Sequence, residues 1–439
     1  MVSSTGESTS PKPSFRYWWN ALHPATKPVR IAYLNPVGQL GGAEISLLDL
    51  LAGIRVAEPA WELHLVTGED GPLVERAQAL GVQVKVLPFP RALARLGDSG
   101  SRPLAALWQA LGAVTGTAVY LARLRRTLTA IQPDIVHTNG FKMHILGTWA
   151  RRERTPVIWH IRDYVSSRPV MKRLLRFHAG RCALAIGNSN SVAQDIQRAC
   201  GPRFDAVCIY NAVNLVQYSP DGPRADLDSL SGLPQAEPSS VRIGLIATLA
   251  HWKGHAVFLR ALAELPDHLD YRAYVIGGPI YQTEKSQHTL DQLRAFAVQL
   301  GIAHRVGFTG FMSKPADAMR ALDIIVHAST QPEPFGRVIA EGMACGRAVI
   351  CSAAGGALEL VTDGRDALTH APGDHVALAD CIVKLAQDSD LRACLGRAGR
   401  ATAERRFELS RLAEEMIPLY RRITALPTPG SSAELAAAR

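Results

Sequence analysis

Cysteine is scarce in this sequence and is absent from its first 181 residues. The seven cysteines, which begin at Cys182, are odd in number and show no C-x-x-C spacing. This pattern argues against a disulfide framework and against a zinc site built from cysteine pairs. We therefore expect scattered thiols in a reducing, cytoplasmic environment.

The sequence also lacks a signal-peptide pattern, a low-complexity tract and a strongly hydrophobic span. Residues 1–27 are rich in Ser, Thr and Pro without a basic-then-apolar segment, so we interpret them, like 427–439, as flexible tails. Residues 103–122 contain no charged side chain and are long enough to cross a bilayer. Because they include Gln109, two glycines and two threonines, we favour a buried or surface-lying helix.

Acidic residues are too few in the first half to balance the basic ones. Residues 1–220 hold 25 Lys and Arg against 14 Asp and Glu, a net charge of +11, whereas the remainder holds 23 against 25, a net charge of −2. A basic half is typical of proteins with an anionic partner. We expect this partner to be a membrane surface, at the inner face of the plasma membrane, or a phospholipid-linked acceptor. Nucleic acid is a less suitable partner. An ordinary solvated basic face is the alternative.

The chain is long enough for two domains of ordinary size. Short apolar runs alternate with helical segments, which predicts parallel sheets covered by helices on both faces. The alternation occupies 28–218 and again 241–404, and the proline-rich residues 219–240 between them predict a linker. Residues 405–426 predict a C-terminal helix. The predicted strands are 29–34, 62–67, 82–87, 134–137, 156–160 and 182–186 in the first domain, and 241–247, 272–276, 306–308, 323–327 and 348–351 in the second.

Two polar constellations lie at strand ends of the first domain. A glycine-rich loop with Gly41 and Gly42 follows the first predicted strand and suits either a phosphate or a tight turn. His137 and His160 end neighbouring strands, and each alone is typical of a satisfied structural histidine. Together they favour a functional site, which Arg162 and Asp163 could complete by orienting His160 or contacting the substrate.

Two further constellations follow strands of the second domain. Lys253 comes after a short loop and could aim an ammonium at phosphates, although a surface lysine at a helix start is the alternative. The segment from Glu333 to Glu341 places one carboxylate in a loop and the other within an apolar helix. A buried carboxylate needs hydrogen-bond donors, and the hydroxyls of a ribose or sugar supply them.

These segments resemble the retaining glycosyltransferases of family 4, which have the GT-B fold. Glu333 and Glu341 match the family's E-x7-E pattern, and Lys253 matches the lysine of its R-L-x-x-x-K-G segment. Residues 355–359 resemble its G-G-x-x-E segment. The looser likeness of the first half rests on residues 41–44, 133–137 and 211–214. The resemblance implies two Rossmann-like, doubly wound α/β domains that face each other across a cleft, with a C-terminal helix that crosses back to the N-terminal domain.

The resemblance also implies roles for individual residues. Glu341 would hold the nucleotide ribose, Lys253 the diphosphate and Glu333 the hydroxyls of the donor sugar, with His160 lining the reacting face. The remaining donor contacts would come from Gly41, Gly42, Phe335 and Gly336. The family's arginine is replaced here by Thr248, so Arg162 or Arg337 would supply the missing charge. His137, Arg162 and Asp163 would lie on the acceptor side of the cleft.

The resemblance thus predicts transfer of a sugar from a UDP- or GDP-sugar, with retention of configuration and without a metal or another cofactor. The acceptor would be a sugar, a glycolipid or another small molecule, as in glycan, cell-surface polysaccharide or glycolipid biosynthesis. A nucleotide-sugar epimerase, a phosphorylase and a catalytically silent sugar-binding protein of the same fold are the alternatives. Hydrolysis of a nucleotide-sugar would separate the transferase from the silent protein.

Overall fold

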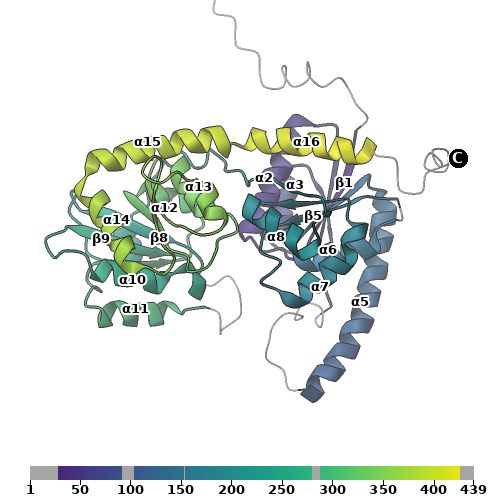
Figure 1. Ribbon diagram of the computed structural model, residues 1–439, viewed down its shortest axis with the longest axis horizontal. Coiled ribbons are helices and arrows are strands. Elements are labelled where there is room, and N and C mark those ends of the chain that lie inside the picture. The colour runs from purple at the N-terminus through teal and green to yellow at the C-terminus, as the bar shows by residue number, and fades with distance from the viewer. Residues whose placement is uncertain (1–27, 91–102, 153, 279–286, 426–439) are drawn as a thin grey trace, which may run out of the picture.

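The computed structural model describes residues 28–90, 103–152, 154–278 and 287–425, and the tails predicted at 1–27 and 427–439 lie outside them. Two lobes lie side by side, and a pair of helices runs along the top of both (Figure 1). Each lobe is built on one parallel sheet, as the alternating pattern predicts.

The first sheet has seven parallel strands in the order β3-β2-β1-β4-β5-β6-β7. Strands β4, β5 and β6 are buried along their whole length, which is typical of a parallel sheet covered on both faces. The elements of this lobe are β1 (Arg30–Asn35), α2 (Gly42–Ala57), β2 (Glu62–Thr67), α3 (Pro72–Ala79), β3 (Gln83–Val86), α5 (Pro103–Ile131), β4 (Ile135–Asn139), α6 (Phe141–Ala150), β5 (Val157–Ile161), α7 (Pro169–His178), β6 (Leu184–Gly187), α8 (Asn190–Cys200) and β7 (Ala206–Cys208).

Alternate residues of β1 supply the cores on the two faces of this sheet. Ile31 and Tyr33 pack in the core that includes α2, whereas Ala32 and Leu34 pack in the core that includes α5 and α6. This period of two follows from the strand geometry, in which successive side chains point to opposite faces.

The second sheet has six parallel strands in the order β10-β9-β8-β11-β12-β13, again with a separate core on each face. Its elements are β8 (Val241–Ile246), α10 (His255–Ala263), β9 (Tyr271–Ile276), α11 (Leu290–Gln299), β10 (Val306–Gly310), α12 (Pro315–Arg320), β11 (Ile324–His327), α13 (Arg337–Ala344), β12 (Ala348–Ser352), β13 (Leu368–His370) and α14 (His375–Gln387).

The chain crosses between the lobes twice. The predicted linker 219–240 contains a short helix, α9 (Leu227–Ser231), whose Leu227 is buried in a core of the second lobe. At the end of the chain, α15 (Ser389–Arg406) lies on the second lobe and α16 (Leu409–Ala425) returns to the first (Figure 1). Met416, Ile417 and Tyr420 of α16 are fully buried in the same core as α2. The C-terminal helix that crosses back to the first domain is therefore confirmed.

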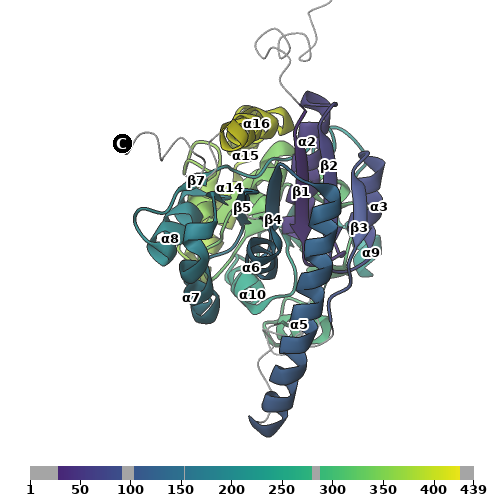
Figure 2. The same ribbon diagram turned by 90° about the vertical axis from the view of Figure 1, so that its right-hand side faces the viewer.

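The structure also differs from the sequence prediction in several elements. The short strands β7 and β13, of three residues each, were not predicted, although β7 lies in the apolar run 206–210. The helix predicted at 405–426 corresponds to α16, and α15, which precedes it in the chain, was not predicted as a separate helix. The uncharged residues 103–122 form most of α5, which continues to Ile131 and projects beyond the body of the lobe (Figure 2). In the part of the chain that the structure describes, no helix combines the length and the apolar character needed to cross a membrane.

Candidate active site

The predicted site residues follow strands at the points where the strand order of each sheet reverses. In the first sheet this point lies between β1 and β4, and the loop after β1 ends at Gly41, which precedes the first residue of α2, Gly42. In the second sheet it lies between β8 and β11, and the loops after these strands carry Lys253 and Glu333. Ligands of open α/β sheets bind at such reversals, outside the carboxyl ends of the strands.

Glu333 is the centre of a buried polar cluster in the second domain. Its Oε2 accepts hydrogen bonds from Lys253 Nζ at 2.8 Å and Ser329 Oγ at 2.9 Å, and lies 3.2 Å from His327 Nε2. Burial opposes ionisation of Glu333, but the charge of Lys253 and the contact with His327 outweigh it and hold the pKa of the carboxyl well below its usual value. Among the residues that the structure describes, all three contacts reach Oε2, so Oε1 can accept a hydroxyl of a ligand.

The backbone around Lys253 fixes the direction of its ammonium. His251–Lys253 form one turn of 3-10 helix, and Lys253 Nζ lies 3.9 Å from the centre of the Trp252 ring. Gly254 then takes a φ of +78°, where a side chain would overlap the backbone carbonyl of Ala328. The loop after β8 is therefore packed directly against the loop after β11, which brings Lys253 to Glu333.

The loop after Glu333 is anchored by an aromatic side chain. Phe335 is buried and packs edge-on against Phe407, with ring centres 5.9 Å apart. Gly336 takes a φ of +93° and begins α13, so backbone amides of the first turn point towards the loop. The Phe335 side chain thus supports the loop from the protein interior, and only backbone groups of Phe335 and Gly336 can contact a ligand.

Arg337 connects the second domain to the first. Its Nε donates to Glu341 Oε1 at 3.0 Å, and its Nη1 donates to Asp49 Oδ2 at 2.9 Å and to Ser46 Oγ at 3.0 Å, both on α2. Its aliphatic chain also lies against Gly42. The charge of Arg337, predicted to replace the family's arginine towards phosphate, is therefore shared between two carboxylates in this structure.

Glu341 is a buried acid, and Asp49 is a half-buried one. Burial raises the pKa of Glu341 and of Asp49, and the charge of Arg337 offsets part of that rise for each. Asp49 was missed in the sequence analysis, although a lone acid between Leu48 and Leu50 is the same signal that identified Glu341.

The two predicted histidines lie in the interior of the first domain and contact each other. His137 Nε2 lies 3.2 Å from His160 Nδ1, and His137 Nδ1 lies 2.9 Å from the Tyr420 hydroxyl of α16. Burial lowers the pKa of both imidazoles well below the usual value, so both are neutral. His137, predicted at the acceptor side of a cleft, is fully buried and joins β4 to α16.

The hydrogen bonds fix the tautomer of His160. Arg162 can only donate, and its Nη2 reaches His160 Nδ1 at 3.3 Å. Nδ1 therefore accepts, and Nε2 carries the proton. Among the residues that the structure describes, this buried Nε2–H has no hydrogen-bond partner.

The other predicted residues of the first domain are engaged in its own loops. Arg162 also donates to Asn139 and Asn211, and burial together with the charge of Arg337 lowers its pKa to about 9. Asp163 pairs with Arg168 at 3.0 Å and does not contact His160. Gly41 donates its amide to Glu44 at 3.1 Å, at the start of α2. In the second domain, Thr248 is half-buried in the loop after β8 and brings no charge there.

A second contact between the domains lies at Glu359, in the segment that resembles the family's G-G-x-x-E. Its carboxylate accepts backbone hydrogen bonds from Asn190 at 2.8 Å and Ser191 at 2.7 Å, in the first turn of α8, and a third from the Tyr210 hydroxyl at 2.9 Å. Carboxylates are favoured at helix N-termini by the unpaired amides and the helix dipole. Glu359, like Asp49, was not among the predicted site residues.

Replacing Glu359 by glutamine should loosen this contact between the domains. The amide side chain keeps the shape but loses the charge that the α8 amides favour, which we expect to cost about 1 kcal/mol. The measurement is the radius of gyration by small-angle X-ray scattering, which should increase. Glu264→Gln, at an exposed residue of the second domain, is the control, and equal scattering from both variants would contradict the expectation.

Comparison with known proteins identifies the class to which this site belongs. Sequence models of two families match the chain, Glycosyltransferase Family 4 over residues 40–217 and Glycosyl transferases group 1 over residues 236–402. The two matches together include most strands of both sheets. The two parts of the chain therefore belong to these glycosyltransferase families, and together they have the GT-B fold.

Individual proteins show how far the similarity extends. The chain is 30% identical over 247 residues to a D-inositol 3-phosphate glycosyltransferase of Xylanimonas cellulosilytica, a match that covers 54% of this chain and 57% of that protein. It is 29% identical to the lipopolysaccharide core biosynthesis mannosyltransferase LpcC of Rhizobium leguminosarum, over 48% of this chain and 58% of that protein. The chain thus spans little more than half the length of these two proteins. HepE of Anabaena, solved in complex with UDP, superposes with a TM-score of 0.73 at 25% identity and covers 90% of this chain and 100% of its own.

Proposed function

We propose that this enzyme transfers a sugar from a nucleoside diphosphate sugar, with retention of configuration, and that UDP is the nucleotide. The pairing of Lys253 with Glu333 is the observation that carries the proposal. A cation for the diphosphate and a carboxylate for the sugar stand 2.8 Å apart, at the strand-order reversal of the second sheet. The choice of UDP is supported by HepE, which has also been solved with UDP-glucose and is 26% identical.

Transfer of the sugar requires stabilisation of the negative charge on the departing diphosphate. As the bond to the sugar breaks, negative charge develops on the phosphate oxygen, and preformed donors lower the barrier. Lys253 supplies the positive charge, and the backbone amides that begin α13 supply further donors. We propose that no metal is required, because these groups take the place of a cation.

Two further residues complete the proposed donor site. Glu341 would accept hydrogen bonds from the ribose hydroxyls, and its bond to Arg337 through Oε1 holds it in place. His160 would donate its unpartnered Nε2–H to an oxygen of the sugar, in keeping with the tautomer fixed by Arg162. The neutral imidazole of His160 is suited to donating a hydrogen bond to a sugar hydroxyl, and less suited to acting as a general acid.

The acceptor is proposed from charge and from similarity. A sugar or glycolipid acceptor at the inner face of the plasma membrane fits the net charge of +11 in the first 220 residues. The similarity to LpcC, a lipopolysaccharide core mannosyltransferase, supports a cell-surface glycolipid or polysaccharide product. The enzyme would then work in the cytoplasm with peripheral contact to the membrane.

Thermal unfolding with candidate donors tests the proposal. A nucleotide that binds only the folded enzyme adds about 2.7 kcal/mol of stability at a concentration of 100 Kd. We expect a higher Tm with UDP-sugars, and a much smaller increase for Glu341→Gln, which loses the ribose acceptor. Asp49→Asn is the matched control, because Asp49 also binds Arg337 but would not contact the ribose.

Three results would count against the proposal. Equal Tm increases in Glu341→Gln and Asp49→Asn would mean that Glu341 does not bind the ribose. A donor that binds but is never hydrolysed or transferred would indicate the silent sugar-binding protein, and an isomerised donor would indicate the epimerase.

A further inference from the structure

Helix α7 carries an exposed apolar ridge on the first domain. Val170, Leu174 and Phe177 follow one another at intervals of four and three residues, so they lie on one side of the helix. Their exposed fractions are 72%, 37% and 80%. The helix packs on the domain through other positions, Leu175 and His178, which are buried. The ridge therefore makes no contribution to the core of the domain.

Basic residues lie beside this ridge on α7, and the helix itself carries no acid. Arg173 and Arg176 are exposed on the adjoining side of α7, and Lys172 is half-buried. Neither α7 nor the long helix α5 contains an aspartate or glutamate. We call the exposed Val170, Arg173, Leu174, Arg176 and Phe177 the α7 surface.

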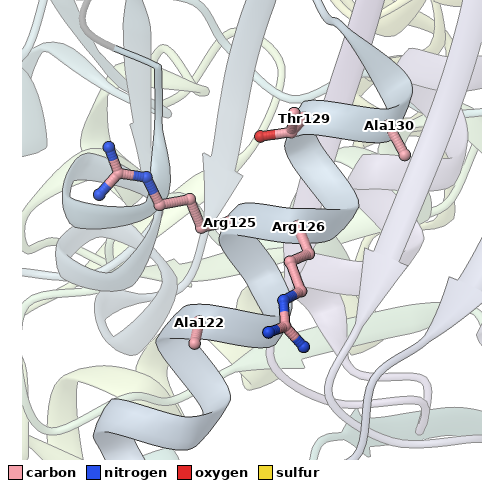
Figure 3. A pocket seen from close by; sticks show the side chains of 5 residues that line it. All are labelled: Ala122, Arg125, Arg126, Thr129 and Ala130. Carbon is pink, nitrogen blue, oxygen red and sulfur yellow. The ribbon is translucent and has the colours of Figure 1, made fainter.

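The positive charge continues on the neighbouring helices. Helix α6 contacts both α5 and α7, and its half-exposed Trp149 donates to His178 of α7. On α5, Arg125 and Arg126 line a surface depression, and both side chains extend outward from the helix (Figure 3). The projecting end of α5 and the helix α7 lie towards the same end of the molecule in both views (Figures 1 and 2). The cations beside the ridge are therefore Arg173 and Arg176 of α7 itself, while Arg125 and Arg126 lie nearer the other end of α5.

We propose that the α7 surface docks the enzyme on a bilayer of anionic phospholipid. Phe177 and Val170 enter the boundary between headgroups and acyl chains, while Arg173 and Arg176 bind lipid phosphates. This combination of a narrow apolar ridge and flanking cations is typical of helices that lie in the membrane interface. The inference deepens the peripheral membrane contact proposed above and rests on it. It is independent of which donor the enzyme uses.

Sedimentation of the full chain with vesicles tests the surface. We expect binding to phosphatidylcholine vesicles that contain phosphatidylglycerol, and little binding to phosphatidylcholine alone. Removal of both charges in Arg173→Gln/Arg176→Gln should weaken binding by roughly 25-fold, at about 1 kcal/mol for each cation. Removal of the ridge in Val170→Ser/Phe177→Ser should weaken it by on the order of tenfold or more.

A matched variant separates the ridge from general surface hydrophobicity. Val298→Ser changes the same residue type on α11 of the second domain, where Val298 is 67% exposed, and should leave vesicle binding unchanged. Tm and donor hydrolysis should stay at the wild-type level in every variant, so a loss of binding is distinguishable from misfolding and from failure of the proposed function.

Three outcomes would overturn the proposal. These are unchanged binding in both double variants, equal binding to neutral and anionic vesicles, and a dimer in solution that Val170→Ser/Phe177→Ser dissociates. The last outcome would mean that the ridge binds a second copy of the chain instead of lipid.

Discussion

Replacing Lys253 by methionine should lower the rate of donor hydrolysis by roughly 10²- to 10³-fold, as expected when one preformed group is removed from a developing anion. Methionine keeps much of the aliphatic length beside Trp252 but removes the ammonium that lies 2.8 Å from Glu333. Glu333→Gln should cause a comparable loss, because it removes the carboxylate that pairs with Lys253 and that we propose to contact the sugar. The measurement is release of free sugar or UDP from the donor under saturating conditions.

Each of these single variants should also destabilise the fold. The side chains of Lys253 and Glu333 are 19% and 9% exposed, and removal of one partner leaves the other charge buried without its counter-ion. Such losses typically amount to about 3 kcal/mol. The double variant Lys253→Met/Glu333→Gln has no unpaired charge, so its free energy of unfolding should return towards the wild-type value.

The double variant therefore separates catalysis from stability. We expect its activity to stay as low as that of either single variant while its stability recovers. If activity recovered together with stability, the pair would be structural, and the donor site would have to lie elsewhere. Single variants that keep near-wild-type rates would have the same consequence.

The sequence predicted the architecture because its signals are local. Alternating apolar runs and helices define two parallel sheets, and the E-x7-E spacing together with Lys253 identified the residues that follow β8 and β11. Chain topology then brings these residues together at one reversal point, as the Lys253–Glu333 contact confirms. The tertiary fold adds only the direction from which the Lys253 side chain approaches Glu333, and Gly254 and the Trp252 ring set this direction.

The contacts between the domains could not be predicted in the same way. Arg337 looked like a free cation in sequence, because its partner Asp49 lies 288 residues earlier on another domain. Glu359 was recognised as part of a motif, yet its contact with the start of α8 depends on how the two lobes meet. His137 was expected near a ligand, whereas α16 covers it from the far end of the chain. Only the assembled domains define these partners.

Replacing Arg337 by methionine should destabilise the enzyme most at neutral and alkaline pH. Burial opposes the charge of Arg337, but Asp49 and Glu341 outweigh it and hold the pKa of the guanidinium above its usual value. Without Arg337, both carboxylates lose their counter-charge, at a cost of at least about 3 kcal/mol when they are ionised. Donor affinity should fall as well, because Glu341 would no longer be held in position for the ribose.

The pH dependence follows from the direction of the pKa shifts. Burial already raises the pKa of Asp49 and Glu341 in the wild type, and loss of Arg337 removes the interaction that offsets the rise. The folded variant then binds more protons than the unfolded chain, so its free energy of unfolding must increase as pH falls. We expect denaturant unfolding curves of Arg337→Met to approach those of the wild type as the pH is lowered and the two acids bind protons. Adding Asp49→Asn should remove part of this pH dependence, and a stability difference that stays constant with pH would mean that Arg337 does not neutralise these two acids.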